Sequence, residues 1–186
     1  MSEPLRAGHY WKVPFVWDPS CPVPAASAAL GFETARDDGL LDAVARVMAD
    51  SRDESDRYAV ALNGAPPAAA ELLALAPRHF EVRPGWWKVA CDGRGQLVGF
   101  VLPVLFRRDA GRHDAGPEGT IFYMGVLPAH RGHGHAVALL GEATRTFQAA
   151  GCSSALCDTG ETNRPMVAAF RRAGYRERSR WQRKVA

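Results

Sequence analysis

The segment with the clearest potential for chemistry is an apolar strand that passes through a glycine-containing turn into a helix, Val126-Leu127-Pro128-Ala129-His130-Arg131-Gly132-His133-Gly134-His135-Ala136. Glycine has no Cβ, so the backbone N–H groups of such a turn can approach a ligand closely. The first turn of a helix leaves N–H groups without intrahelical partners, and the helix dipole favours negative charge there. The segment therefore predicts a phosphate-binding loop.

Two common phosphate-binding motifs do not fit this segment. A dinucleotide-binding Gly-x-Gly-x-x-Gly pattern that starts at Gly132 and Gly134 would need a third glycine where Val137 stands. A P-loop needs Gly-Lys-Ser/Thr, and no lysine occurs between Lys88 and Lys184. Neither a Rossmann dinucleotide site nor a P-loop nucleotide site is therefore expected.

The three histidines of the segment, His130, His133 and His135, could also suggest a metal site. They straddle a turn and a helix start, so their rings need not converge, and no Asp, Glu or Cys lies close in sequence to complete a ligand set. We therefore expect no metal and interpret these residues as variable positions of the phosphate loop. A protonated His133 or His135 could still assist a phosphate.

The elements that position the loop alternate between strands and helices. Hydrophobic periodicity predicts strands over residues 28–34, 86–91, 97–106, 120–126 and 154–157, a last alternating strand over 175–181, and helices over about 37–48, 68–76, 136–150 and 166–173. The turn sequence Asp92-Gly93-Arg94-Gly95 joins two of the strands as a hairpin. A hairpin-rich first half followed by strand–helix–strand–helix–strand indicates an α/β fold.

The first 26 residues form a stretch rich in proline and aromatic side chains. Its five prolines exclude a helix and leave short edge strands or an extended wrap. The aromatic residues, among them Trp11 and Trp17, indicate that the stretch packs on the rest of the protein. We therefore predict an N-terminal extension, residues 1–26, packed on a single domain of residues 27–186.

Length and composition are those of one globular domain, since the chain has 186 residues, of which 47% are hydrophobic and 23% are charged. No run of about 18 apolar residues occurs, so no membrane-spanning segment is expected, and the opening residues lack the apolar core of a signal peptide. Four scattered cysteines do not form the pattern of a disulfide framework. These features favour a cytoplasmic location.

Two motifs of the sequence resemble those of the GNAT superfamily of acyl-CoA-dependent N-acetyltransferases. Arg131, Gly134 and Ala136, at the end of a strand, match the family signature Arg/Gln-x-x-Gly-x-Gly/Ala. Asn163, followed by Gly174-Tyr175, is similar to the family's asparagine-to-Gly-aromatic helix. The resemblance implies an α/β (α+β) fold with a central twisted mixed β-sheet, flanked by helices and splayed between its fourth and fifth strands.

The resemblance also implies acetyl-CoA as co-substrate, bound in the cleft between those two strands, with no metal. The main chain at residues 125–127 would hold the pantetheine arm, and the Val126 N–H would polarise the thioester carbonyl. The backbone from Arg131 to Ala136 would wrap the pyrophosphate. The cofactor-binding residues so implied are Gly125, Val126, Leu127, Arg131, Gly132, His133, Gly134, His135, Ala136 and Asn163.

Two departures from the family pattern leave the proton-transfer residues open. Phe170 stands where the family often has a tyrosine that acts as general acid, and residues 120–126 contain no acidic residue where the family often has a glutamate. Tyr175 and Tyr123 could replace the tyrosine, and Asp158 and Glu161 are the nearest carboxylates by sequence. The candidate catalytic residues are therefore Val126, Tyr175 and Asp158.

The resulting prediction is an N-acetyltransferase that moves an acetyl group from acetyl-CoA to a primary amine by direct attack in a ternary complex. A small-molecule acceptor is favoured over a protein because no separate recognition domain is evident. One alternative is a non-catalytic acyl-CoA sensor. Another is a nucleic-acid-binding module that uses residues 163–186, which contain eight basic residues and one acidic residue. We expect neither membrane nor nucleic acid as a partner, and a homodimer is left open.

Overall fold

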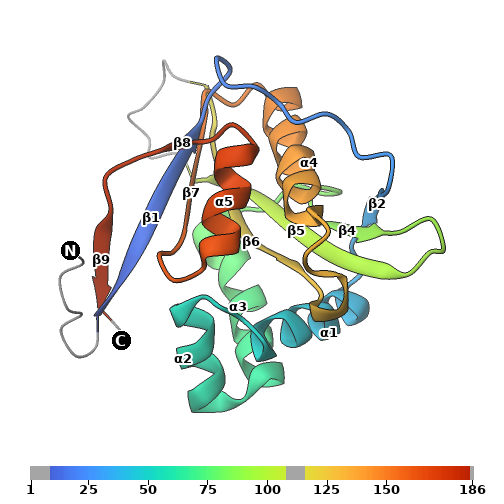
Figure 1. The fold of residues 1–186 in the computed structure, drawn as a ribbon, viewed down its shortest axis with the longest axis vertical. Coiled ribbons are helices and arrows are strands. Elements are labelled where there is room, and N and C mark those ends of the chain that lie inside the picture. Colours follow the sequence, from blue (N-terminus) through green and yellow to red (C-terminus); the bar gives the residue numbers. More distant parts are fainter. Residues whose placement is uncertain (1–8, 108–115, 185–186) are drawn as a thin grey trace.

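The computed structural model describes residues 9–107 and 116–184, which build a mixed sheet with helices on both faces (Figure 1). The first eight residues of the predicted N-terminal extension lie outside the described residues. The strands are β1 (His9–Trp17), β2 (Gly31–Thr34), β3 (Phe80–Glu81), β4 (Lys88–Cys91), β5 (Leu97–Phe106), β6 (Glu118–Val126), β7 (Ser154–Gly160), β8 (Arg176–Glu177) and β9 (Trp181–Lys184). The helices are α1 (Asp37–Ala49), α2 (Glu54–Asn63), α3 (Ala65–His79), α4 (His135–Ala149) and α5 (Arg164–Arg172), with a short 3-10 turn over Pro128–His130.

The strand order is β2-β4-β5-β6-β7-β1-β8, with β3 paired to β5 and β9 paired to β1. All pairings are antiparallel except that of β6 with β7. These two parallel strands are the predicted fourth and fifth strands. They pair only where they begin, Glu118 with Ser154 and Gly119 with Ala155, and then diverge. The predicted mixed sheet and its splay are thus confirmed.

Two hydrophobic cores hold the helices to opposite faces of the sheet. One core packs α4 and α5 against β1, β5 and β7 and includes Phe15, Phe147 and Phe170. The other packs α1 and α3 against β5 and includes Val44 and Phe100. In Figure 1, α4 and α5 lie in front of the sheet and α1 to α3 gather at its lower end. Because β5 contributes to both cores, its sequence is an almost uninterrupted apolar run.

The sequence pattern did not predict helix α2, because its apolar side chains form one unbroken run, residues 58–62, and do not recur with a helical period. It begins after Asp53, whose carboxylate caps the helix by accepting a hydrogen bond from the Ser55 N–H at 3.1 Å. Acidic residues fill the first turn, Glu54 and Asp56. An aspartate cap before an acidic first turn is a helix-start signal, and it is the one that could have found α2.

The strand β1 is longer and more central than the short edge strands or extended wrap expected from its prolines. It pairs with β7 on one side and with β8 and β9 on the other. Pro14 is tolerated because its backbone faces the side where the C-terminal strand is interrupted, and its carbonyl accepts a hydrogen bond from the Arg178 N–H at 2.9 Å. The same interruption divides the single last strand predicted over 175–181 into β8 and β9. The domain boundary at residue 26 stays a prediction.

Among the described residues, no single helix has both the length and the apolar character needed to cross a bilayer. Helices α2 and α3 taken together have the length and composition of a membrane span, but the chain bends by 119° between them.

Candidate active site

A cavity of about 1500 Å³ opens where β6 and β7 diverge. At one end it is lined by the predicted phosphate loop, including Gly132, Gly134 and Ala136. At the other end it is lined by α2 and α3. Pockets for one drug-sized ligand usually measure about 300–1,000 Å³, so this cavity has room for two substrates side by side.

The phosphate loop presents free backbone donors at the start of α4. Within the described part of the chain, the N–H groups of residues 132–136 have no hydrogen-bond acceptor, and the first bond of the helix runs from the Val137 N–H to the Gly134 carbonyl at 3.0 Å. Gly132 and Gly134 have φ values of +87° and +79°, and a Cβ built on either would meet no atom within 4 Å. The left-handed backbone and the open space on this side fit an anionic group held by main-chain N–H groups.

The side chain of Arg131 holds this loop against the rest of the protein. Its Nε donates to the Val126 carbonyl at 3.1 Å, and its Nη1 donates to the carbonyl and the carboxylate of Asp50 at 2.8 and 2.7 Å. These bonds tie the end of β6 to the C-terminal end of α1. The contribution of Arg131 to a bound ligand is therefore through the position of the main chain.

At the end of β6, the backbone N–H and C=O groups of successive residues point alternately toward β5 and toward the gap between β6 and β7. The Leu127 N–H donates to the Val98 carbonyl of β5 at 2.9 Å, so the main chain of Leu127 and of Gly125 faces β5. The Val126 N–H faces the opposite side, toward the gap, as an oxyanion donor must. Of the main chain at residues 125–127, the groups of Val126 are therefore the ones that face the gap, and the assignment of Gly125 and Leu127 to the cofactor stays a prediction. Gly125 also allows α1 to pack closely, since a Cβ there would lie 2.4 Å from Val47 Cγ1.

The position of Tyr175 contradicts its prediction as a general acid. Its side chain is 4% exposed, lies in the core on the α5 side, and does not line the cavity. Its hydroxyl lies 2.9 Å from Thr144 Oγ1. Burial raises the pKa of Tyr175 far above its ordinary value. The tyrosine therefore stabilises the packing of α4 against α5.

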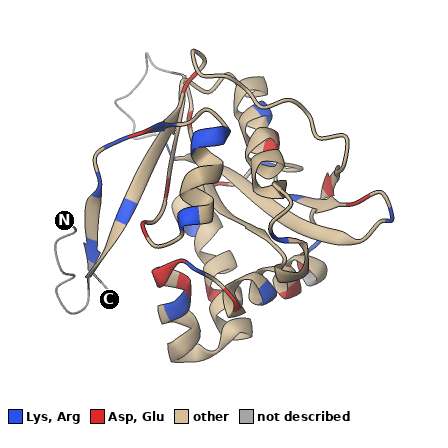
Figure 2. Ribbon diagram, in the orientation of Figure 1, with Lys and Arg blue, Asp and Glu red and all other residues tan. Residues whose placement is uncertain are grey.

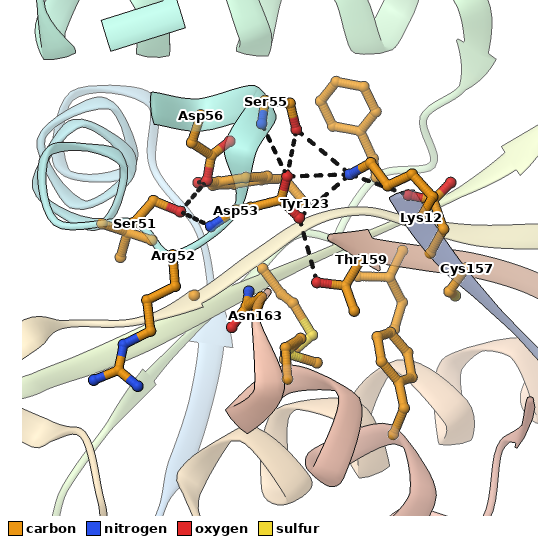
Figure 3. Close-up of a pocket in the computed structure, with 18 of the residues that line it drawn as sticks. Lys12, Ser51, Arg52, Asp53, Ser55, Asp56, Tyr123, Cys157, Thr159 and Asn163 are labelled. Carbon is orange, nitrogen blue, oxygen red and sulfur yellow. Dashed lines mark hydrogen bonds and ion pairs between the residues drawn. The ribbon is translucent and has the colours of Figure 1, made fainter. Parts of the chain in front are cut away.

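A buried charge cluster lies between β1, β7 and α2, at the open end of the gap (Figure 3). The ammonium of Lys12 lies 3.1 Å from Asp53 Oδ1 and 3.4 Å from Asp158 Oδ1. Asp53 also accepts hydrogen bonds from the Gly160 N–H at 2.6 Å and from the Ser55 hydroxyl at 2.6 Å. Asp158 lines the cavity within this cluster, and its role as a catalytic base stays a prediction.

The pKa values of Lys12 and Asp53 favour the charged form of both residues. Burial pushes the pKa of Asp53 upward, but the Lys12 ammonium and the hydrogen bonds from Ser55 and Gly160 outweigh burial and hold that pKa below its usual range. Burial lowers the pKa of Lys12, but the carboxylates of Asp53 and Asp158 outweigh it and raise that pKa. The cluster is therefore an ionised clamp, which we call the Lys12 clamp (Lys12, Asp53 and Asp158).

A second carboxylate in the cavity, Asp56, was not found from the sequence. It is 8% exposed, and its Oδ2 accepts hydrogen bonds from the hydroxyls of Tyr123, at 2.7 Å, and Ser51 (Figure 3). Its Oδ1 has no partner among the described residues. Burial raises the pKa of Asp56 despite these hydrogen bonds. Burial, followed by the Asp56 charge, also raises the pKa of Tyr123, so the phenol stays protonated.

A model of the acetyltransferase (GNAT) family matches residues 44–175, more than half of the chain. The chain belongs to this family. Family members use acetyl-CoA as co-substrate, and the free N–H groups of the phosphate loop fit its pyrophosphate. Among curated proteins, none matches the chain.

Solved structures of GNAT proteins share the fold at low sequence identity. A GCN5-related N-acetyltransferase from Sphaerobacter thermophilus has a TM-score of 0.55 and 18% identity, covering 95% of this chain and 52% of its own. A GNAT-family acetyltransferase from Colwellia psychrerythraea has a TM-score of 0.57 and 13% identity, covering 95% and 56%. A candidate acetyl transferase from Pyrococcus furiosus has a TM-score of 0.59 and 18% identity, covering 81% and 95%. The chain thus spans about half the length of the first two proteins.

Two further residues of the GNAT pattern, Asn163 and Phe170, line the cavity, and so does Cys157. Asn163 begins α5, and its carboxamide has no hydrogen-bond partner among the described residues. Phe170 occupies the position of the family's usual tyrosine and stacks on Phe15, with ring centroids 4.6 Å apart. Cys157 lies deeper, and burial raises the pKa of its thiol to about 12. Asn163 is thus placed to contact a ligand, whereas Cys157 is a protonated thiol and a poor nucleophile.

The rings of the histidines in the phosphate loop do not converge on one point. The His133 ring is exposed, does not line the cavity, and lies with its centroid 5.8 Å from that of His135. Burial, and then the neighbouring His133 and His130, lower the pKa of His135. The described residues contain no group of three or more metal-ligating side chains.

Basic residues are frequent along α5 and the C-terminal strands (blue in Figure 2), and three of these arginines are held in ion pairs. Arg171 binds Glu177 at 2.6 Å, Arg176 binds Asp18, and Arg180 binds Glu161. Arg172, by contrast, lines the cavity. Three of the eight basic residues in 163–184 are therefore paired with carboxylates of the protein itself.

Proposed function

We propose that this GNAT protein transfers an acetyl group from acetyl-CoA to a primary amine of a small molecule, by direct attack within a ternary complex. The observation that carries the proposal is that one cavity joins the free N–H groups of the phosphate loop, the cleft-facing Val126 N–H and the Asp56 carboxylate. An anion site, an oxyanion donor and a base are the groups that acyl transfer to an amine requires.

The chain's own residues supply the binding of both substrates. Acetyl-CoA brings the acetyl group as a thioester. The N–H groups of residues 132–136 bind its pyrophosphate, the Asn163 carboxamide contacts its pantetheine arm, and the Val126 N–H stabilises negative charge on the carbonyl oxygen. Holding both substrates in one cavity supplies much of the rate enhancement through proximity.

Direct attack is favoured over an acyl-enzyme on cysteine because Cys157, the cysteine that lines the cavity among the described residues, has an unreactive thiol. The thiol of Cys157 stays protonated, with a pKa raised by burial to about 12. The acceptor amine itself is therefore the nucleophile.

The Asp56 carboxylate takes the proton of the acceptor. Its free Oδ1 accepts a proton from the ammonium group, and its raised pKa makes it a stronger base than an exposed aspartate. The neutral amine nitrogen then attacks the carbonyl carbon and forms the new C–N bond, the C–S bond breaks, and CoA leaves as the thiolate, which takes up the second proton that the nitrogen loses as the amide forms. Tyr123 positions Asp56 through the hydrogen bond on Oδ2.

A non-catalytic acyl-CoA sensor is the alternative that Phe170 favours, because phenylalanine has no proton for the thiolate. Release of CoA and formation of acetylated product, measured with a panel of primary amines, separate the two functions. If the protein is an enzyme, at least one amine is turned over. We then expect turnover by Asp56→Asn to be about 10²-fold slower than by wild type. Turnover by Asp42→Asn, which changes an exposed aspartate on α1, should be unchanged. Binding of acetyl-CoA with no turnover of any amine would show a sensor.

A further inference from the structure

Large exposed apolar side chains gather at the acceptor end of the cavity. Among the described residues, six large hydrophobic side chains are exposed, and five of them line this cavity: Tyr58, Leu62, Phe106, Leu156 and Trp181. The sixth, Leu41, lines a separate hollow between α1 and α3. Scattered exposed apolar residues need no explanation, whereas a concentration around one hollow marks a binding surface.

These side chains form two facing walls. Tyr58 and Leu62 are four residues apart in α2, so they share one face of that helix. Leu156 pairs with Val16, and Trp181 pairs with Lys12, so all four side chains lie on one face of the β7-β1-β9 part of the sheet. The cavity thus runs between an apolar helix face and a partly apolar sheet face.

A cluster of phenylalanines extends the apolar lining toward α3. Phe80 lies with its ring centroid 5.5 Å from that of Phe106 and 5.6 Å from that of Phe122. All three rings line the cavity, together with Leu72 and Leu75 of α3. Aromatic rings in this arrangement favour a flat or branched apolar ligand.

The charges around the same walls discriminate between kinds of amine. The Asp56 carboxylate lines the cavity and attracts one ammonium group, whereas the Asp158 carboxylate is paired with Lys12. Arg52, Arg178 and Arg183 also line it, and among the described residues none of their side chains has an ion-pair partner. These cations repel an acceptor that carries further positive charges.

We propose that the acceptor is a primary amine with a single positive charge and an aromatic or branched aliphatic body. Its ammonium group lies at Asp56, and its body lies between the α2 face and the Leu156–Trp181 face. The proposal rests on the acetyltransferase function above and names the substrate class of that same site. It separates arylalkyl and branched alkyl amines from polyamines and amino sugars, which carry more charge or little apolar surface.

The test compares kcat/KM for phenethylamine and isoamylamine with kcat/KM for spermidine and glucosamine, at saturating acetyl-CoA. We expect the first pair to exceed the second by at least about tenfold, the scale on which an apolar pocket discriminates. Leu62→Asn should raise KM for phenethylamine by about tenfold and leave kcat unchanged. Leu41→Asn, an exposed leucine on α1 that does not line the cavity, is the matched control and should behave as wild type.

Two results would overturn this substrate class while leaving the acetyltransferase function intact. One is a kcat/KM for spermidine or glucosamine equal to or above that for phenethylamine. The other is an equal effect of Leu62→Asn and Leu41→Asn on KM. Failure of the function itself has a different signature, since no amine of either class would then be acetylated.

Discussion

The Lys12 clamp gives a prediction whose size follows from burial. In Lys12→Met the side chain stays unbranched and is one heavy atom shorter, and it loses its charge, which leaves Asp53 without its cation. The Lys12 and Asp53 side chains are only 6% and 13% exposed, so water replaces little of the lost interaction. Removing one partner of a buried ion pair costs about 3–5 kcal/mol. Because Asp53 keeps donors from Ser55, Thr159 and Gly160, we expect about 3 kcal/mol.

The pH dependence of this loss has a definite sign. In wild type the pKa of Asp53 is lowered, so its stabilisation is present above the ordinary aspartate pKa of about 3.9 and is lost as pH falls through the folded value. The pKa of Lys12 is raised, so its stabilisation is present below about 10.4 and is lost as pH rises through the folded value. The difference in unfolding free energy between wild type and Lys12→Met is therefore largest between these values and shrinks at either extreme.

Thermal and urea unfolding at pH 7, at about pH 2.5 and at about pH 11.5 measure this difference, because the two outer values lie beyond the ordinary pKa values of aspartate and lysine. At pH 7 the variant should melt roughly 6–12 °C below wild type, since about 1 kcal/mol lowers the melting temperature of a domain of this size by about 2–4 °C. Arg46→Met removes an exposed pair with Asp42, whose side chains are 53% and 69% exposed, and should cost less than about 0.5 kcal/mol. A Lys12→Met loss no larger than that of Arg46→Met, or one that does not vary with pH, would refute a buried clamp.

Three further predictions concern the cavity. Asp56→Asn should remove the acid limb of the kcat/KM profile, which in wild type lies above the ordinary aspartate pKa because burial raises the pKa of Asp56; an unchanged limb would assign the base elsewhere. Gly125→Ala should lower the unfolding free energy by about 1–3 kcal/mol, measured by urea denaturation, because its Cβ would meet Val47 at 2.4 Å, and an equally stable variant would contradict the close packing of α1. Phe170→Tyr should leave the acetyl-CoA dissociation constant unchanged and raise kcat by supplying an acid; weaker binding would show that Phe170 acts mainly in packing.

The phosphate loop could be predicted from the sequence because its chemistry is local. Gly132 and Gly134 adopt left-handed backbone conformations beside a helix start, and both features follow from residue types a few positions apart. The splayed sheet followed from the resemblance carried by Arg131 and Asn163. Hydrophobic periodicity is also a local signal, and β5, β6, α4 and α5 accordingly lie close to where it predicted them.

The acceptor side of the site could not be predicted because its residues meet only through the fold. Asp56 and Tyr123 are 67 residues apart, and Lys12 and Asp53 are 41 residues apart. The helix α2 lacks a clear apolar period, and β1 lies where prolines had suggested an edge. Tyr175, chosen for its place in a motif, turned out to be a core residue.

Binding of acetyl-CoA tests the central claim most directly, with the melting temperature as readout. A ligand at about 100 times its dissociation constant adds about 2.7 kcal/mol of stability, which for this chain is a rise of roughly 5–10 °C. Gly134→Asp should abolish the rise by placing a carboxylate in the phosphate loop, whereas Gly151→Asp, at another open glycine with φ of +67°, should retain it. We predict a rise with acetyl-CoA and CoA but not with NAD or ATP. No rise at millimolar acetyl-CoA, or an equal rise in Gly134→Asp, would contradict the account.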